Sequence, residues 1–308
     1  MEFKSFNITK DDHDRRADRI VRRFLPKLSL SGIYKLMRKG LVRIDGKKVS
    51  PEFHVIEGSS LEIAVGLLDT VKDQREPQLT GFIPEILHES ADLLFINKPA
   101  GLPVHGDGGL DSLIAQSASS DQSLSFRTGP LHRLDRDTTG ILAFSRSLTG
   151  ARWFSLGVHE HHFQKYYLGI VEGPVTETAE WRDSDEDDKP MITLVRPVTR
   201  AKATGHQTTL LRFQIVTGRK HQIRIQSQKR GHPLIGDSRY NPRKSPDSYC
   251  LHAWQMLFPA DRPEDIPEKI VAPLPDRFKT RIRELFGADV LAHIERGELY
   301  WNQYDEHQ

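Results

Sequence analysis

Cysteine is almost missing from this sequence, because Cys250 is the single cysteine among 308 residues. One cysteine cannot form an internal disulfide, so a small disulfide-stapled fold is excluded. No stretch reaches the roughly 18 apolar residues that cross a membrane, and residues 1–16 contain no apolar core of a signal peptide. These absences predict a cytoplasmic protein with no membrane span.

Net charge is also small, since 44 Lys and Arg residues face 42 Asp and Glu residues. The hydrophobic content of 37% is enough for one large domain and a small one. The charge is unevenly distributed: residues 1–50 hold 14 basic and 6 acidic residues, a net +8, which leaves about −6 for the rest. The N-terminal segment is therefore expected to bind a polyanion.

This basic segment has the pattern of two short helices followed by a hairpin. Residues 14–25 carry apolar side chains at helical spacing, and a second helix is expected to end at Lys39. Residues 41–49 predict a hairpin with an Asp-Gly turn, and residues 60–65 a further strand. A small basic domain of no special function is the alternative. The cations expected to contact phosphates are Arg19, Arg22, Arg23, Lys35, Arg38, Lys39 and Arg43.

Residues 131–147, LHRLDRDTTGILAFSRS, combine a charged loop with a buried strand. Five ionisable residues fall within residues 132–137, a Thr-Thr-Gly turn follows, and residues 141–144 are apolar. Polar groups at the mouth of a buried strand often bind a ligand. In the alternative interpretation, Asp135 only caps a turn and pairs with a neighbouring arginine in a solvated loop.

Three other segments stand out elsewhere in the chain. Residues 97–105, NKPAGLPVH, predict a fixed turn. Residues 163–171 predict a strand that places Tyr166 and Tyr167 on opposite faces. Residues 217–224, TGRKHQIR, follow an alternating strand, and we expect them to be extended, with their two arginines on opposite sides.

These segments resemble, in the same order, four motifs of the RluA-type pseudouridine synthases. HRLDRDTTG resembles that family's HRLD-x-x-T-S/T-G signature, and NKPAGLPVH, KYYLGIV and TGRKHQIR resemble its companion motifs. The segment over residues 14–66 resembles the alpha-L RNA-binding module. The resemblance spans nearly the whole chain.

The resemblance implies an α+β fold, in which a large mixed, mainly antiparallel sheet carries a central cleft. It also implies three parts: an alpha-L type RNA-binding module over 14–66, a linker over 67–84, and a catalytic domain over 85–308. Structured RNA, with ribosomal RNA first among the candidates, is the expected partner of a monomeric enzyme.

The function implied by the resemblance is isomerisation of specific uridines to pseudouridine, most closely in large-subunit ribosomal RNA. Catalytic roles would fall on Asp135, Tyr167 and Arg224, with Arg133 inserting where the target base was and His132 supporting the loop. Such an isomerase needs no cofactor.

Two other functions and one departure from the family pattern remain to be considered. A non-catalytic structured-RNA-binding protein would keep the basic segment, and a hydrolase using Asp135 would release free uracil. The family's histidine two positions after the arginine is Gln226 here, so no role carries over. The histidines of residues 159–162 lack metal-ligand spacing, and no metal is expected.

Overall fold

The computed structural model of this chain describes residues 2–68, 83–106, 108–117, 123–124, 126–201, 207–243 and 248–297. The chain divides into two compact units. The first comprises residues 1–82, 113–129 and 145–151, and the second comprises residues 83–112, 130–144 and 152–308. No helix in the described ranges is both long and apolar enough to span a bilayer.

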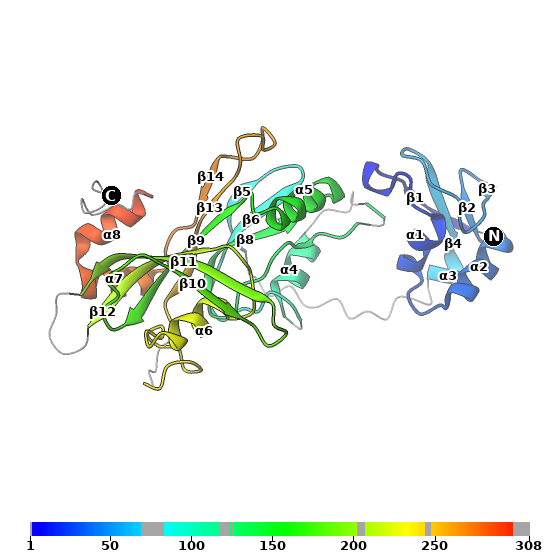
Figure 1. The fold of residues 1–308 in the computed structure, drawn as a ribbon. Coiled ribbons are helices and arrows are strands. Elements are labelled where there is room, and N and C mark those ends of the chain that lie inside the picture. The colour runs from blue at the N-terminus through cyan, green and yellow to red at the C-terminus, as the bar shows by residue number, and fades with distance from the viewer. Residues whose placement is uncertain are drawn as a thin grey trace. The chain divides into compact units, whose positions relative to one another are not determined.

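The first unit contains a four-stranded antiparallel sheet (Figure 1). In spatial order its strands are β1 (Phe3–Asn7), β4 (Ser60–Ala64), β2 (Val42–Ile44) and β3 (Lys47–Lys48). Asp45 and Gly46 join β2 to β3 with φ angles of 50° and 73°, as a tight hairpin turn requires. Its helices are η1 (Lys10–Asp12), α1 (Ala17–Phe24), α2 (Leu30–Arg38) and α3 (Val65–Leu68).

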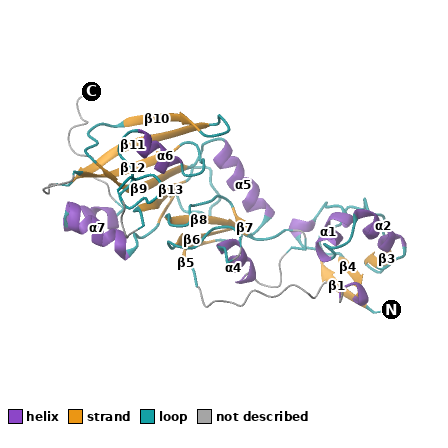
Figure 2. Cartoon of the chain, turned by 90° about the horizontal axis from the view of Figure 1, so that it is seen from below, coloured by secondary structure: helices purple, strands orange, loops and turns teal. Residues whose placement is uncertain are grey.

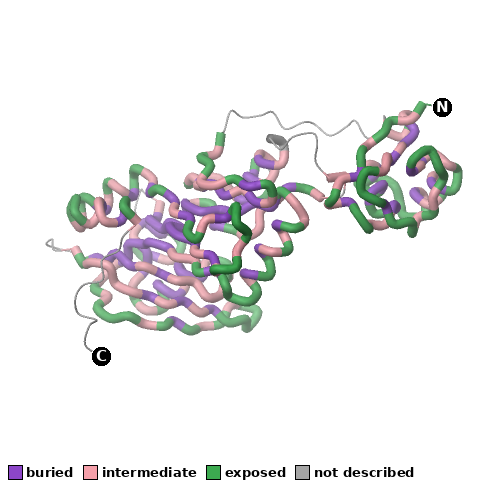
Figure 3. Tube along the Cα trace, turned by 90° about the horizontal axis from the view of Figure 1, so that it is seen from above, coloured by how far each residue is buried: buried purple, intermediate pink, exposed green. Residues whose placement is uncertain are grey.

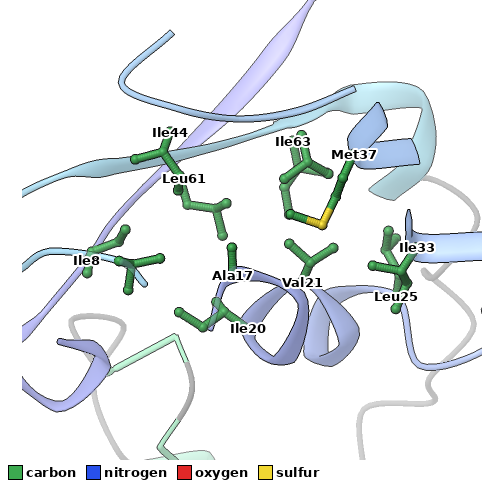
Figure 4. Close-up of a cluster of buried hydrophobic side chains, with 12 residues drawn as sticks. Ile8, Ala17, Ile20, Val21, Leu25, Ile33, Met37, Ile44, Leu61 and Ile63 are labelled. Carbon is green, nitrogen blue, oxygen red and sulfur yellow. The ribbon is translucent and has the colours of Figure 1, made fainter. Parts of the chain in front are cut away.

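One face of each of α1 and α2 is buried in the core of the first unit. Figure 4 shows side chains of α1 pointing toward those of β4 and of α2. The Ser29 hydroxyl caps α2 by accepting a hydrogen bond from Gly32 N at 3.2 Å. The core residues are Ile8, Ala17, Ile20, Val21, Leu25, Ile33, Met37, Val42, Ile44, Val55, Leu61 and Ile63.

The first unit has different limits from the expected module over 14–66. It includes β1, which pairs with β4 along its whole length. The segments 113–129 and 145–151 also group with it, and the buried carboxylate of Asp12 accepts hydrogen bonds from Ser123 Oγ and Leu124 N. Of the expected linker over 67–84, residues 69–82 lie outside the described residues.

A ten-stranded mixed sheet forms the second unit's scaffold. From one edge to the other its main path runs β10 (Ala179–Ser184), β11 (Pro190–Arg200), β12 (Thr208–Ile215), β9 (Gln164–Glu172), β13 (Leu251–Leu257), β8 (Thr139–Ser145), β6 (Leu93–Lys98) and β5 (Glu85–Glu89), as Figure 2 shows. Off this path, β14 (Lys269–Val271) pairs with β13, and β7 (Gly129–Pro130) with β8. The pairing of β13 with β8 is parallel, whereas β12 with β9 and β9 with β13 are antiparallel.

Helices cover the sheet and bury its apolar residues. The helices that follow β6 are α4 (Leu110–Ser117), α5 (Leu148–His159), α6 (Gln222–Lys229), α7 (Asp276–Phe286) and α8 (Ala288–Glu295). Phe154 of α5 packs with Phe95 and Ile141 of the sheet, while α7 and α8 cover Leu168 and Trp254. In Figure 3 the buried stretches gather in the interior of the second unit, and exposed residues lie around them. The expected α+β fold with a large mixed, mainly antiparallel sheet and a small N-terminal module is confirmed.

The expectation of an extended segment at residues 217–224 is wrong, because helix α6 begins at Gln222. Gln222 and Gln226 are one helical turn apart, and both are buried with their amides fully engaged. Ile223 and Ser227 repeat the same spacing. Buried polar side chains at i and i+4 fit a helix whose inner face is hydrogen-bonded to the sheet.

Gly140 allows β8 to approach β13 closely. Its φ is +105°, and a Cβ there would overlap the carbonyl oxygen of Ala253 and lie 2.7 Å from the Ala253 nitrogen. Since Ala253 is the parallel partner of Gly140, only glycine fits without shifting the strand pair.

We predict that Gly140→Ala lowers the free energy of unfolding by about 2–4 kcal/mol, because both the backbone angle and the strand contact become strained. Gly129→Ala on the neighbouring strand β7 is the control, since a Cβ there meets only the Arg127 carbonyl oxygen at 3.8 Å. Urea unfolding of both variants measures the difference. Equal stabilities would show that β8 and β13 can separate at no cost.

Candidate active site

The loop that carries Asp135 is held by a buried lysine at the end of β6. Lys98 donates from Nζ to the carbonyl oxygens of Pro99 (2.8 Å), Arg136 (2.7 Å) and Thr138 (3.0 Å). Burial, partly offset by the charges of Asp137 and Asp135, lowers the pKa of Lys98 to about 8. The loop between β7 and β8 is therefore tied to the sheet through its backbone.

Asp135 lies against an arginine of α6. Arg224 Nη1 donates to Asp135 Oδ2 at 3.2 Å, while its Nε and Nη2 donate to the two oxygens of Asp237 at 2.7 and 2.9 Å. Asp237 is fully buried and also accepts from the amides of Arg239 and Tyr240. A bidentate pair of this kind fixes the plane of the guanidinium group, so Nη1 of Arg224 is held in an orientation that reaches Asp135.

Two tyrosine rings enclose the same guanidinium. The Arg224 carbon Cζ lies 4.4 Å from the ring centroid of Tyr249 and 5.0 Å from that of Tyr240. Burial lowers the pKa of Arg224. The hydrogen bonds from Arg224 to Asp237 and the surrounding charges outweigh this effect and raise the pKa above its usual value. Arg224 is therefore a permanent cation beside Asp135.

His221 flanks the other oxygen of Asp135. Its Nε2 lies 3.7 Å from Asp135 Oδ1, and its Nδ1 lies 2.8 Å from the hydroxyl of Tyr240. The residue has a φ of 55°, in the left-handed region that non-glycine residues rarely adopt. Burial and the charges of Arg224, Arg239 and Lys220 lower the pKa of His221, while that of Asp135 opposes them.

Asp135, Arg224 and His221 line a cavity of about 590 Å³ within the second unit. Tyr167 of β9 also lines it and is only 7% exposed, whereas Tyr166 faces away and hydrogen-bonds Gln164. Burial and the charge of Asp135 raise the pKa of Tyr167 above its usual value. Asp135 is the only carboxylate among the described residues that line the cavity. Its basic lining residues are Arg133, Lys165, Arg219, Lys220 and Arg224.

Arg133 and His132 have very different surroundings. The side chain of Arg133 is exposed at the cavity and makes no hydrogen bond or ion pair with the described part of the chain. His132 accepts a hydrogen bond from Ala143 N at 3.1 Å and stacks on Phe154, with ring planes 7° apart. Burial and the charge of Lys165 lower the pKa of His132 to about 3, so its neutral ring serves as an acceptor.

The cations singled out near the N-terminus lie on the outer faces of the first unit. All are exposed except Arg43, which is partly buried with Nε donating to Gly40 O at 3.1 Å and the guanidinium over the Phe3 ring. Arg23 Nη1 donates to Phe126 O at 2.6 Å. The exposed set is Arg19, Arg22, Arg23, Lys35, Arg38 and Lys39.

The histidines at the end of α5 and just after it have different surroundings. His162 faces Glu160 at 3.5 Å, and His159 and His161 line the cavity. Within the described ranges no group of three His, Cys, Asp or Glu side chains is placed to hold a metal ion.

Several residues of this site received no role from the sequence. Asp237 lies after α6, and no sequence pattern indicated that it pairs with Arg224. Lys98 stood in the NKP motif with no function assigned to it. Gln226, at the departure from the family pattern, accepts from Thr193 Oγ1 and donates to Trp181 O and Met191 O, which ties α6 to the sheet.

Comparison with known proteins agrees with this geometry. Residues 92–229, which include the Asp135 loop, β9 and α6, match the RNA pseudouridylate synthase family. Ribosomal large subunit pseudouridine synthase C of Vibrio vulnificus is 29% identical over 308 residues, covering 91% of this chain and 95% of that protein. The enzyme of the same name from Escherichia coli O157:H7 is 28% identical over 313 residues, covering 91% and 96%.

These matches identify the chain as an RNA pseudouridine synthase, an isomerase. Two solved structures share the fold of this pseudouridine synthase. Human RNA Pseudouridylate Synthase Domain Containing 4 has a TM-score of 0.55 at 22% identity, covering 65% of this chain and 92% of that chain. Human RNA Pseudouridylate Synthase Domain Containing 1 has a TM-score of 0.53 at 20% identity, covering 71% and 97%.

A buried histidine joins the strands on which the site of this pseudouridine synthase is built. His252 of β13 is fully buried, with Nε2 donating to Ala272 O at 3.2 Å and Nδ1 accepting from the Thr139 hydroxyl at 2.7 Å. Burial lowers the pKa of His252 to about 4, although its bond to Ala272 opposes the shift.

We predict that His252 contributes stability above the unfolded pKa of about 6.5, and that this contribution is lost as the pH falls toward 4. The unfolded chain takes up a proton in this range and the folded chain does not. The loss at pH 5 relative to pH 8 should be about 2 kcal/mol. In His252→Gln, the difference in unfolding free energy between pH 8 and pH 5, measured by urea unfolding, should be smaller by this amount. An unchanged pH dependence of the unfolding free energy in His252→Gln would show that His252 is charged at pH 5 in the folded protein.

Proposed function

We propose that this pseudouridine synthase acts on specific uridines of large-subunit ribosomal RNA and that Asp135 is its essential residue. The observation that carries the proposal is the placement of Asp135, the single carboxylate among the described residues that line the cavity, beside several cations and with one oxygen held by Arg224. The two bacterial relatives support the substrate, because their names specify the ribosomal large subunit and they align over nearly the full chain.

The reaction exchanges one bond to the sugar for another. The bond between the ribose C1′ and the uracil nitrogen breaks, the base turns over, and a bond forms between C1′ and a ring carbon. That carbon gives up a proton, and the nitrogen gains one. No electrons are transferred to or from the nucleoside and water is not consumed, so this chemistry calls for no cofactor.

Each of the three catalytic candidates has a distinct part in this scheme. The carboxylate of Asp135 acts as a nucleophile or stabilises positive charge at the sugar, the two roles that carboxylates perform in glycoside chemistry. Arg224 holds that carboxylate in place. Tyr167, a neutral phenol at physiological pH, stacks on the base and donates a hydrogen bond or a proton.

The target uridine must leave its stack to enter the cavity, at a cost of a few kcal/mol. Arg133 is suited to take the vacated place, since its side chain is exposed beside the cavity and is engaged by no described residue. His132, fixed to Ala143 N, holds the backbone from which Arg133 projects.

The first unit supplies RNA affinity in this proposal. The exposed cations of α1 and α2 can contact phosphates of a folded RNA without reading its bases. Because such contacts release counterions, they should make binding sensitive to salt.

We predict that Asp135→Asn forms pseudouridine at least about 10³-fold more slowly than the wild type, because the substitution removes the charge and the nucleophile. Its RNA affinity should stay within about threefold of the wild type, since phosphate contacts supply most of the binding. Nucleoside chromatography of large-subunit ribosomal RNA from cells without this gene, treated with each enzyme, measures the product.

Asp137→Asn is the matched control, because this carboxylate lies two residues away on the same loop and does not line the cavity. It should keep substantial activity. Equal, modest losses of activity at the two positions would support the alternative in which both carboxylates only cap turns and pair with neighbouring arginines. Release of free uracil would identify a hydrolase, and RNA binding by the wild type without any product would identify a non-catalytic RNA-binding protein.

A further inference from the structure

Lys165 is a cation on the cavity wall that the proposed chemistry does not use. It lies on β9, two residues before Tyr167, and both residues line the cavity. Alternate residues of a strand share a face and rise about 3.3 Å each, so the two side chains leave the strand about 7 Å apart on the same side. Lys165 is thus built into the wall beside the proposed stacking residue.

Lys165 has no acidic partner among the residues that the structure describes. It makes no hydrogen bond or ion pair there, although it is partly buried. Asp135, the one carboxylate of the cavity, is already held by Arg224 and flanked by His221. Burial lowers the pKa of Lys165, and the charge of Lys165 lowers that of His132, as expected for an ammonium group whose field is not neutralised nearby.

A partly buried, unpaired ammonium group disfavours the folded state, because it loses hydration without gaining a partner. A methionine would fill the same space without that cost. The position therefore suits a ligand that brings the negative charge with it, and Arg133, Arg219 and Lys220 add to the positive field of the cavity. In an RNA chain, the anionic groups next to a nucleotide are its two flanking phosphates.

We propose that Lys165 binds a phosphate that flanks the target uridine and thereby seats the nucleotide between Tyr167 and Asp135. This inference rests on the proposed function, since it assigns a contact within the same site. It makes Lys165 a substrate-binding residue whose charge is satisfied only in the complex with RNA.

The test uses the full chain and an oligonucleotide that contains a mapped target uridine. Lys165→Met should weaken RNA binding and lower kcat/KM by about 10- to 100-fold, the usual effect of losing a hydrogen bond to a charged group. The slope of the logarithm of RNA affinity against the logarithm of salt concentration should become shallower by about one, as expected for the loss of one phosphate contact. The kcat at saturating RNA should change less than about threefold, because the contact is made before the chemical step.

Two further variants separate the charge from the fold. Lys165→Arg should restore most of the affinity, and Lys165→Met should unfold at the same temperature as the wild type or higher, since it removes an unpaired charge. Lys269→Met, an exposed lysine on β14 outside the cavity, should leave affinity and salt slope unchanged. A lower unfolding temperature for Lys165→Met, or a wild-type affinity and salt slope, would overturn the proposal.

A change in the RNA tests the same contact without altering the protein. Replacing one of the two flanking phosphates with a neutral methylphosphonate should weaken wild-type binding as much as Lys165→Met does. The same replacement should add almost nothing to the loss in that variant. Full affinity of the wild type for both neutral linkages would contradict the phosphate contact even if Lys165→Met fails to fold. Failure of the proposed function is separate, because it would appear as absence of pseudouridine in the wild-type reaction.

Discussion

The ion pair between Arg224 and Asp237 is the interaction on which the rest of the site depends. Asp237 is fully buried and takes two of the guanidinium's hydrogen bonds, which leaves Nη1 to reach Asp135. Removing one partner of such a pair would leave an uncompensated buried charge, a change that typically costs about 3–5 kcal/mol. The position of Asp135 therefore depends on the carboxylate of Asp237, which does not line the cavity.

Backbone contacts hold the Asp135 loop, so the carboxylate can lie among several cations in the cavity. Lys98 fixes the loop backbone through three carbonyl oxygens, so the charged side chains of that loop need not pair with one another to hold it. Arg224 supplies one fixed charge, and Lys165 of β9 supplies another in the cavity lining. A polyanionic substrate enters such a cavity favourably, and the aspartate stays available for the sugar or the base.

Sequence patterns were sufficient where local rules decide the structure. The uncharged run within β8 and the alternation within β12 predicted strands, and the spacing of apolar residues predicted α1 and α2. The three residues expected to act together, Asp135, Tyr167 and Arg224, come from distant segments and lie at one cavity. Their roles in the reaction stay predictions until the variants are measured.

Helix α6 shows where such patterns fail. HQIRIQSQ alternates polar and apolar residues as a strand would, but Gln222 and Gln226 are buried through hydrogen bonds to β10 and β11 that no local pattern reveals. The pairing of Asp237 with Arg224 is likewise a tertiary contact, as is the joining of β1 to β4 across more than fifty residues. Long-range hydrogen bonds of this kind override local preference.

We infer that Arg224 orients Asp135 only while Asp237 holds the guanidinium group. The most direct measurement is the single-turnover rate of pseudouridine formation by Asp237→Asn at saturating RNA, with Asp183→Asn as the control, because Asp183 pairs with Arg230 of the turn after α6 outside the cavity. We expect a rate about 100-fold below the wild type in folded Asp237→Asn, because misplacing a catalytic group by about 1 Å costs that much. RNA affinity should stay within about threefold of the wild type. A wild-type rate in folded Asp237→Asn would contradict this inference.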